Sequence, residues 1–292
     1  MSGPGPNLDL MVARHPWAGT QLVRRRVRWP YALTTPFRLD AAPADMLTIV
    51  LQSASGAVVA GDRIAQCIEA GPGAALHVTS QAATAVHAMP VGTWAEDCGE
   101  LIVRENAFVE LLPEPRVLFP RAELRQRLVI DMDRGAVAIV GDGFLTHDPS
   151  GQDEPFRRLA AETIVRDGAG RVLAVDRVDV SGPAIGRAEW RAHGWLTVLC
   201  SPERLDAEPA IAALDGALTP ITGLYAGASP LPHAAGIGVR LAARDGEALR
   251  LGLRAAWMSA RRLLTGAAPP SRRKGGGASA MPNKLDTVCP SE

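Results

Sequence analysis

Hydrophobic residues in the body of the chain come in short runs, each bounded by glycine, proline, aspartate or asparagine. Short apolar runs between turn formers favour strands over helices. The clearest examples predict strands over residues 46–51, 76–79, 101–103, 108–112, 124–131, 137–140 and 172–180. The fold class expected from this pattern is therefore mainly β.

Three of these runs begin with the same local pattern. Residues 73–76, 106–109 and 135–138 each place a turn former, an alanine and an apolar strand, with a spacing of about thirty residues. A recurrence of this kind suits a layered or coiled β architecture, although ordinary hairpins would produce it as well. The recurrence alone leaves both architectures open.

Two helices are predicted in the C-terminal half. Asp206 can cap the first, with Pro209 in its first turn. The second shows a helical stripe of apolar residues at positions 253, 256, 257, 260, 263 and 264, and Gly266 supplies a stop signal. Both helices are expected to pack on the β body or on a partner.

The two ends of the chain lack the strand pattern that its middle shows. Residues 1–15 are expected to form a flexible leader, and residues 266–292, rich in glycine, proline and serine, a disordered tail. The short basic run Arg272–Lys274 fits a solvated tail better than a binding patch. The sequence thus predicts one β domain over residues 16–265.

The composition and the N-terminal sequence indicate which partners and which cellular compartment to expect. The 292 residues contain 31 basic and 31 acidic side chains, and the resulting formal net charge of zero argues against a general nucleic-acid binder. The N-terminus lacks the features of a signal peptide, and no apolar run is long enough to cross a membrane. We therefore expect a cytoplasmic protein.

The four cysteines stand at positions 67, 98, 200 and 289, with no CxxC spacing. This spacing signals neither a disulfide framework nor a structural zinc site, so reduced thiols are the simpler interpretation.

A search for catalytic motifs finds none. The chain has no GxSxG elbow and no Walker A loop, and the glycine-containing segment 53–62 lacks the order of a dinucleotide-binding turn. Its histidines form no HExxH or HxxxH pattern. A metal-dependent hydrolase or lyase that uses His77, His87 or His147 stays an alternative, but isolated histidines near strands are more often structural. We expect neither an enzyme nor a bound cofactor.

The segment 111–120 contains three prolines within eight residues. Proline has no N–H group and cannot donate to a sheet ladder. We therefore expect a shaped connection at an edge of the β body.

Several segments together resemble one family. The segments are Ser55–Arg63, 71–75, 79–86, 112–119 and 125–127, and the most specific are Gln81-Ala-Ala-Thr84 and Leu112-Pro-Glu-Pro115. In order and spacing they resemble the UreD family of urease accessory proteins, called UreH in some organisms, over about residues 20–265. This chain differs from the family pattern at Ala57 and Ala60, where glycines are usual, and at Ala85 and His87. Alanine at a position with positive φ would cost about 1 kcal/mol.

The resemblance implies a non-enzymatic chaperone of urease. Its fold would be a large coiled, β-helix-like body of antiparallel and mixed strands, with two helices in the C-terminal half. The resemblance also implies hetero-oligomeric complexes with UreF, with the GTPase UreG and with apo-urease, and a role in nickel insertion in which Ni²⁺ is transferred rather than retained. The alternative is a β-solenoid interaction module that has diverged from urease maturation.

A nickel path needs oxygen or nitrogen ligands that replace the hydration shell of the ion. The candidates that the matched segments and their neighbouring turns offer are the carboxylates of Asp62, Glu114 and Asp142 and the hydroxyls of Ser80 and Thr84. The competing interpretation is that these side chains cap turns, as aspartate, serine and threonine commonly do.

Overall fold

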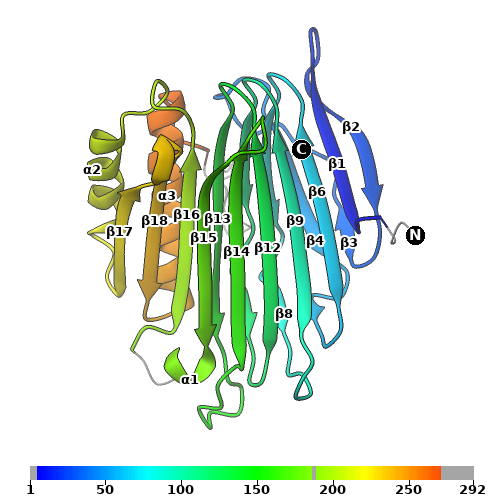
Figure 1. The fold of residues 1–292 in the computed structure, drawn as a ribbon, viewed down its shortest axis with the longest axis vertical. Helices are drawn as coiled ribbons and strands as arrows, with labels where there is room; N and C mark the ends of the chain where they lie inside the picture. The colour runs from blue at the N-terminus through cyan, green and yellow to red at the C-terminus, as the bar shows by residue number, and fades with distance from the viewer. Residues whose placement is uncertain (1–4, 186–188, 271–292) are drawn as a thin grey trace, which may run out of the picture.

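The computed structural model describes residues 5–185 and 189–270, and it confirms a mainly β fold with two large sheets (Figure 1). In spatial order, the seven-stranded sheet contains β15 (Val172–Ser181), β14 (Arg158–Asp167), β12 (Glu123–Met132), β9 (Ala95–Val103), β6 (Arg63–Ala70), β1 (Leu8–His15) and β2 (Gly19–Val27). The second sheet contains β17 (Leu224–Pro230), β18 (Gly236–Ala243), β16 (Ala192–Leu199), β13 (Val137–Thr146), β10 (Phe108–Leu112), β7 (Ala75–Ser80), β4 (Leu47–Ser53) and β3 (Tyr31–Leu33). Three short strands join the second sheet beside this path: β5 (Ala57–Val58), β8 (Ala85–Val86) and β11 (Arg116–Leu118).

The middle of the chain winds as a coil between these sheets. Strands β4, β7, β10 and β13 stack in parallel in one sheet, and β6, β9, β12 and β14 stack in parallel in the other. The winding makes about four solenoid-like turns. Antiparallel pairs at both ends of the coil complete the mixed architecture that the sequence predicts.

The thirty-residue recurrence marks successive turns of this coil. Phe108 lies opposite Ala75 on one side and Val137 on the other, so the three repeated segments are stacked in register. Each chain reversal needs a left-handed backbone, with φ of 63° at Gly73, 55° at Asn106 and 68° at Gly135. Glycine and asparagine tolerate this conformation better than other residues, which explains why turn formers recur there.

The two predicted helices are confirmed. α2 (Ala207–Leu218) begins at Asp206, whose carboxylate accepts the N–H of Glu208. α3 (Gly246–Thr265) ends at Gly266, which has a φ of 75° and donates its N–H to the carbonyl of Arg262. One short helix, α1 (Gly182–Ile185), and a 3-10 turn, η1 (Pro232–Ala234), were not predicted. None of the helices within the described ranges has the length and apolar character needed to cross a bilayer.

The flexible leader expected over residues 1–15 is wrong for residues 8–15, which form β1. Leu8, Leu10 and Val12 alternate with polar or half-buried positions and are fully buried in the core between the sheets. β1 is held on both sides, by β2 and by β6. Most of the tail expected over residues 266–292 lies outside the described residues.

The proline-rich segment was expected at an edge, and this is wrong. It joins β10 to β11 in the interior of the second sheet, where both strands pair with β13. Residues 141–143 of β13 have no ladder partner on that side, between the stretches paired with β10 and with β11. Pro113 and Pro115 fit there because the ladder is interrupted and needs no N–H donor.

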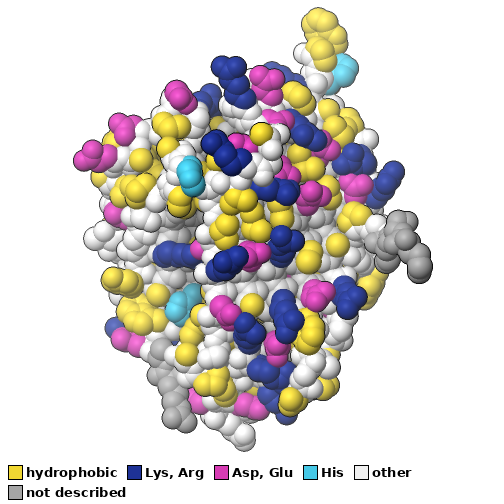
Figure 2. Space-filling model, viewed as in Figure 1, with side chains coloured by type: hydrophobic (Ala, Val, Ile, Leu, Met, Phe, Trp, Pro, Cys, Tyr) yellow, Lys and Arg dark blue, Asp and Glu magenta, His cyan; other side chains and the backbone are white. Residues whose placement is uncertain are grey.

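Apolar packing divides into three clusters. One lies between α2, α3 and the second sheet, and includes Leu214, Leu249 and Ala256. Two lie between the sheets, one containing Leu76 and the other Phe144. The outer face of the seven-stranded sheet carries ion-paired arginine and acidic side chains, interspersed with apolar ones (Figure 2). Polar side chains that are buried between the sheets therefore lie in mainly apolar surroundings.

Candidate functional site: a polar cavity at the break in a strand

A cavity of about 190 Å³ lies between the sheets, beside the break between β10 and β11. Its walls include Leu51, Leu111 and Val140 from one inter-sheet cluster and Val58 and Leu124 from the other. Among these apolar walls stand the polar side chains of Gln66, Asp97, Glu114, Arg116, Gln126 and Asp142. The volume is sufficient for several water molecules.

The centre of this site is an arginine held between two aspartates. A guanidinium nitrogen of Arg116, on β11, lies 2.5 Å from a carboxylate oxygen of Asp97, on β9. Another lies 2.7 Å from a carboxylate oxygen of Asp142, on β13. The three side chains are only 13%, 13% and 18% exposed, respectively. Burial lowers the pKa of Arg116, but Asp142 and Asp97 outweigh it and raise that pKa above its ordinary value.

The two carboxylates are held unequally. Asp142 also accepts the side-chain amide of Gln126 at 3.1 Å and the backbone N–H of Gly143 at 2.7 Å. Asp97 uses Oδ2 for Arg116, while its buried Oδ1 has no hydrogen-bond partner among the described residues. Asp97, Asp142 and Arg116 together carry one net negative charge.

Four of the five residues proposed from the sequence line this cavity. They are Ser80, Thr84, Glu114 and Asp142. The hydroxyl of Ser80 accepts the backbone N–H of Glu114 at 2.8 Å and donates to the carbonyl of Ala82 at 3.0 Å. The backbone carbonyl of Thr84 accepts the N–H of Val117, on β11, at 3.0 Å. The structure thus gathers residues that lie as far apart in sequence as Ser80 and Asp142.

Asp62, the fifth proposed residue, is not part of the cavity wall. Its carboxylate accepts the N–H of Val59 at 2.9 Å and closes the turn between β5 and β6. This is the turn-capping role that competed with the metal-path interpretation. Gly56 and Gly61 in the same segment have positive φ, whereas Ala57 and Ala60 are not among the described residues that do. The two alanine replacements therefore introduce no backbone strain.

A second cavity, also of about 190 Å³, lies beside α3. Pro113, Glu114 and Gly141 line both cavities, so the two spaces share a wall at the break between β10 and β11. The second cavity also contains Arg250, whose pKa is raised mainly by Glu247 and to a smaller extent by Glu114. We call this break in the strand the window, and Glu114 lies at its edge.

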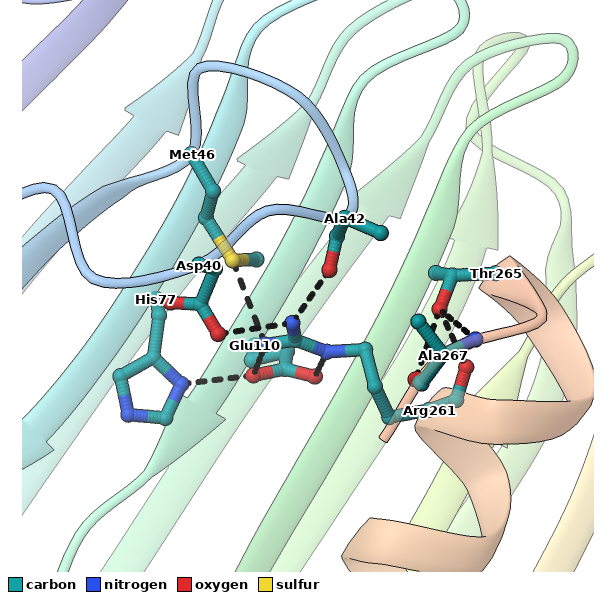
Figure 3. A network of polar contacts seen from close by, with 8 residues as sticks. All are labelled: Asp40, Ala42, Met46, His77, Glu110, Arg261, Thr265 and Ala267. Carbon is teal, nitrogen blue, oxygen red and sulfur yellow. Dashed lines mark hydrogen bonds and ion pairs between the residues drawn. The ribbon is translucent and has the colours of Figure 1, made fainter. Parts of the chain in front are cut away.

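A second buried polar group joins the end of α3 to the sheet and was not predicted (Figure 3). Arg261 donates from two nitrogens to the carboxylate of Glu110, on β10, and also contacts Asp40 at 3.0 Å. His77 Nδ1 lies 2.6 Å from Glu110 on the opposite side. Burial by itself would raise the pKa of Glu110, but Arg261 and His77 lower it to about 2. With all of these groups mutually satisfied, this network is a structural clamp.

The histidines of the hydrolase alternative do not converge. His77 belongs to the clamp, whereas His87 and His147 contact the ring of Phe119, with ring centroids 5.0 and 5.4 Å apart. Within residues 5–185 and 189–270, no group of three or more histidine, cysteine, aspartate or glutamate side chains is arranged to hold a metal ion. No specific observation favours that alternative.

The described cysteines are unpaired thiols. Burial raises the pKa of Cys67 and of Cys200 to about 11, which keeps these thiols protonated and disfavours them as metal ligands. Cys289 lies outside the described residues.

The sequence is similar to those of one family of known proteins. The family model described as UreD urease accessory protein matches residues 5–275. The chain is 40% identical over 247 residues to urease accessory protein UreD 2 of Bradyrhizobium sp. strain BTAi1, covering 85% of this chain and 86% of that protein. It is 38% identical over 260 residues to UreD 1 of Methylorubrum populi, with 87% of each chain covered. It is 31% identical over 266 residues to UreD 1 of Pseudomonas syringae pv. syringae, covering 90% of this chain and 93% of that protein.

Proposed function

Because this chain belongs to the UreD family of urease accessory proteins, we propose that it is a non-enzymatic scaffold that assists nickel insertion into apo-urease. Its partners in this role are UreF and UreG, and the complex acts in the cytoplasm. In this proposal the GTP hydrolysis of the process belongs to UreG, and the sequence of this chain contains no phosphate-binding loop.

The observation that carries the proposal is the pair of cavities that meet at Glu114. A dication crosses a β sheet only where the ladder is open and where oxygen ligands replace its water. The break between β10 and β11 provides the opening, and Glu114 and Asp142 provide carboxylates on the inter-sheet side. Ser80 and Thr84 extend the polar lining. Nickel is the cargo of this path, and the site does not retain it.

The path is tested with a double variant, Glu114→Gln with Asp142→Asn, in a host whose own copy of the gene is deleted. We expect the variant to restore less urease activity than the wild-type chain, with less nickel per urease molecule, at equal amounts of both proteins. Asp62→Asn is the matched control, because this carboxylate caps a turn and does not line the cavity. Full nickel loading by the double variant would refute the path.

Binding to UreF is measured separately, by co-elution of the purified chains. Wild-type chain and double variant are both expected to co-elute with UreF, because the substitutions lie between the sheets or at the window. Absence of co-elution of the wild-type chain would contradict the scaffold role itself.

A further inference from the structure

The centre of the proposed path is occupied by a cation that belongs to the protein. Arg116 stands between Asp97 and Asp142 with its guanidinium within 2.7 Å of both carboxylates. A guanidinium is always charged, and its planar fork matches carboxylates on two sides. In this state a metal ion has no access to the space between the two aspartates without displacing Arg116.

The charges favour an exchange of one cation for another. Two carboxylates face a single positive charge, so the group keeps one net negative charge in a partly apolar cavity. A dication in the place of the guanidinium would neutralise both. Charges in such surroundings interact more strongly than in water, so the doubly charged ion has an advantage that a surface site would not give.

The contacts also show which of the two aspartates, Asp97 or Asp142, is available first to an incoming ion. Asp142 is fixed by Gln126 and by the N–H of Gly143 in addition to Arg116. Asp97 lines the cavity, and its buried Oδ1 has no hydrogen-bond partner among the described residues. An incoming ion can therefore gain a ligand at Asp97 before Arg116 leaves.

We propose that Arg116 is a built-in competitor for the transferred dication, which keeps the Asp97–Asp142 site closed until the ion displaces its guanidinium. The adjoining cavity of about 190 Å³ offers room for the displaced side chain. The return of Arg116 then weakens the hold on the ion, so that the site transmits nickel and does not store it. This inference rests on the proposed nickel path and adds its regulation.

The test is Ni²⁺ binding to the untagged, full-length chain, measured by equilibrium dialysis with the metal alone. Arg116→Gln removes the competing charge, and we expect it to bind one Ni²⁺ at least about tenfold more tightly than wild type. Adding Asp97→Asn should return binding to the wild-type level. The matched control is Arg127→Gln, since Arg127 also lines the cavity but pairs with Glu162 and is 59% exposed.

A second variant covers the case in which Arg116→Gln does not fold. Arg116→Lys keeps the positive charge but pairs with one carboxylate at a time, and we expect binding between those of wild type and Arg116→Gln. Binding of Ni²⁺ no tighter than wild type, in whichever of these two variants folds, would overturn the inference. The dialysis involves no urease, so its outcome is independent of the activation assay that tests the proposed function.

Discussion

Arg261, near the C-terminal end of α3, and Glu110, in β10, form a two-pronged ion pair whose side chains are both fully buried. The two residues are 151 positions apart in sequence. The pair ties the C-terminal helix to a strand in the middle of the coil, directly before the break at Pro113–Pro115. The anchoring of α3 and the position of the window are therefore linked.

Removing one partner of this pair should be costly. Arg261→Met would leave the Glu110 carboxylate buried without its main counter-charge, and we expect a loss of about 3–5 kcal/mol in the free energy of unfolding. Urea denaturation measures this loss. The control Arg262→Met, at the exposed neighbouring position, should change stability by less than about 0.5 kcal/mol. Equal losses in the two variants would show that the buried pair has no special role.

The same pair predicts how stability depends on pH. The pKa of Glu110 falls from 4.5 to about 2 on folding, so its contribution is complete above about pH 4.5 and is lost as the pH falls towards 2. We expect the stability advantage of wild type over Glu110→Gln to shrink as the pH falls from about 4.5 towards 2. Urea midpoints of both proteins over this pH range provide the measurement. An advantage that does not change with pH would contradict the assignment.

Replacing glycine by alanine should change stability in opposite directions at two positions, one in a turn of the coil and one in a helix. Gly135→Ala should destabilise by about 1–3 kcal/mol, because alanine disfavours positive φ and its Cβ would lie 2.2 Å from Asn106 Oδ1. Gly216→Ala, in α2 with open space around it, should stabilise by about 0.5–1 kcal/mol. Thermal unfolding compares the two. A stabilising effect at position 135 would mean that the turn does not need its left-handed backbone.

Local signals in the sequence favoured strands and left a coil open, and the resemblance to the UreD family implied the coil. Turn formers at Gly73, Asn106 and Gly135 mark where strands begin, because only a few residue types tolerate their backbone. β1 was missed because the glycines and prolines among residues 3–6 suggested a leader, while its stabilising partner, β6, is distant in sequence. The alternation of Leu8, Leu10 and Val12 was a visible signal for that strand.

The buried polar groups were harder to predict, since they depend on long-range pairing. Glu110 within an apolar run was a hint of a buried charge, and Arg261 falls on the apolar stripe of α3, but nothing local connects them. Similarly, Ser80, Thr84, Glu114 and Asp142 were selected from matched segments and nearby turns, whereas Asp97 and Arg116 were not. Only the coil places β9, β11 and β13 around one cavity.

Ser80, at the edge of the window, gives a final prediction, in which the matched variant at Ser55 tests whether the Ser80–Glu114 contact matters for urease activation. Ser80 and Ser55 each donate a hydroxyl hydrogen to the carbonyl two residues later, but only Ser80 also accepts the N–H of Glu114. Ser80→Ala should cost about 1 kcal/mol of stability and lower urease activation severalfold, since the Pro113–Pro115 segment loses its support. Ser55→Ala should leave activation unchanged, as measured by urease activity in the deletion host. If both variants activate urease equally well, the position of Glu114 is not set by Ser80, and the window must be held by its prolines alone.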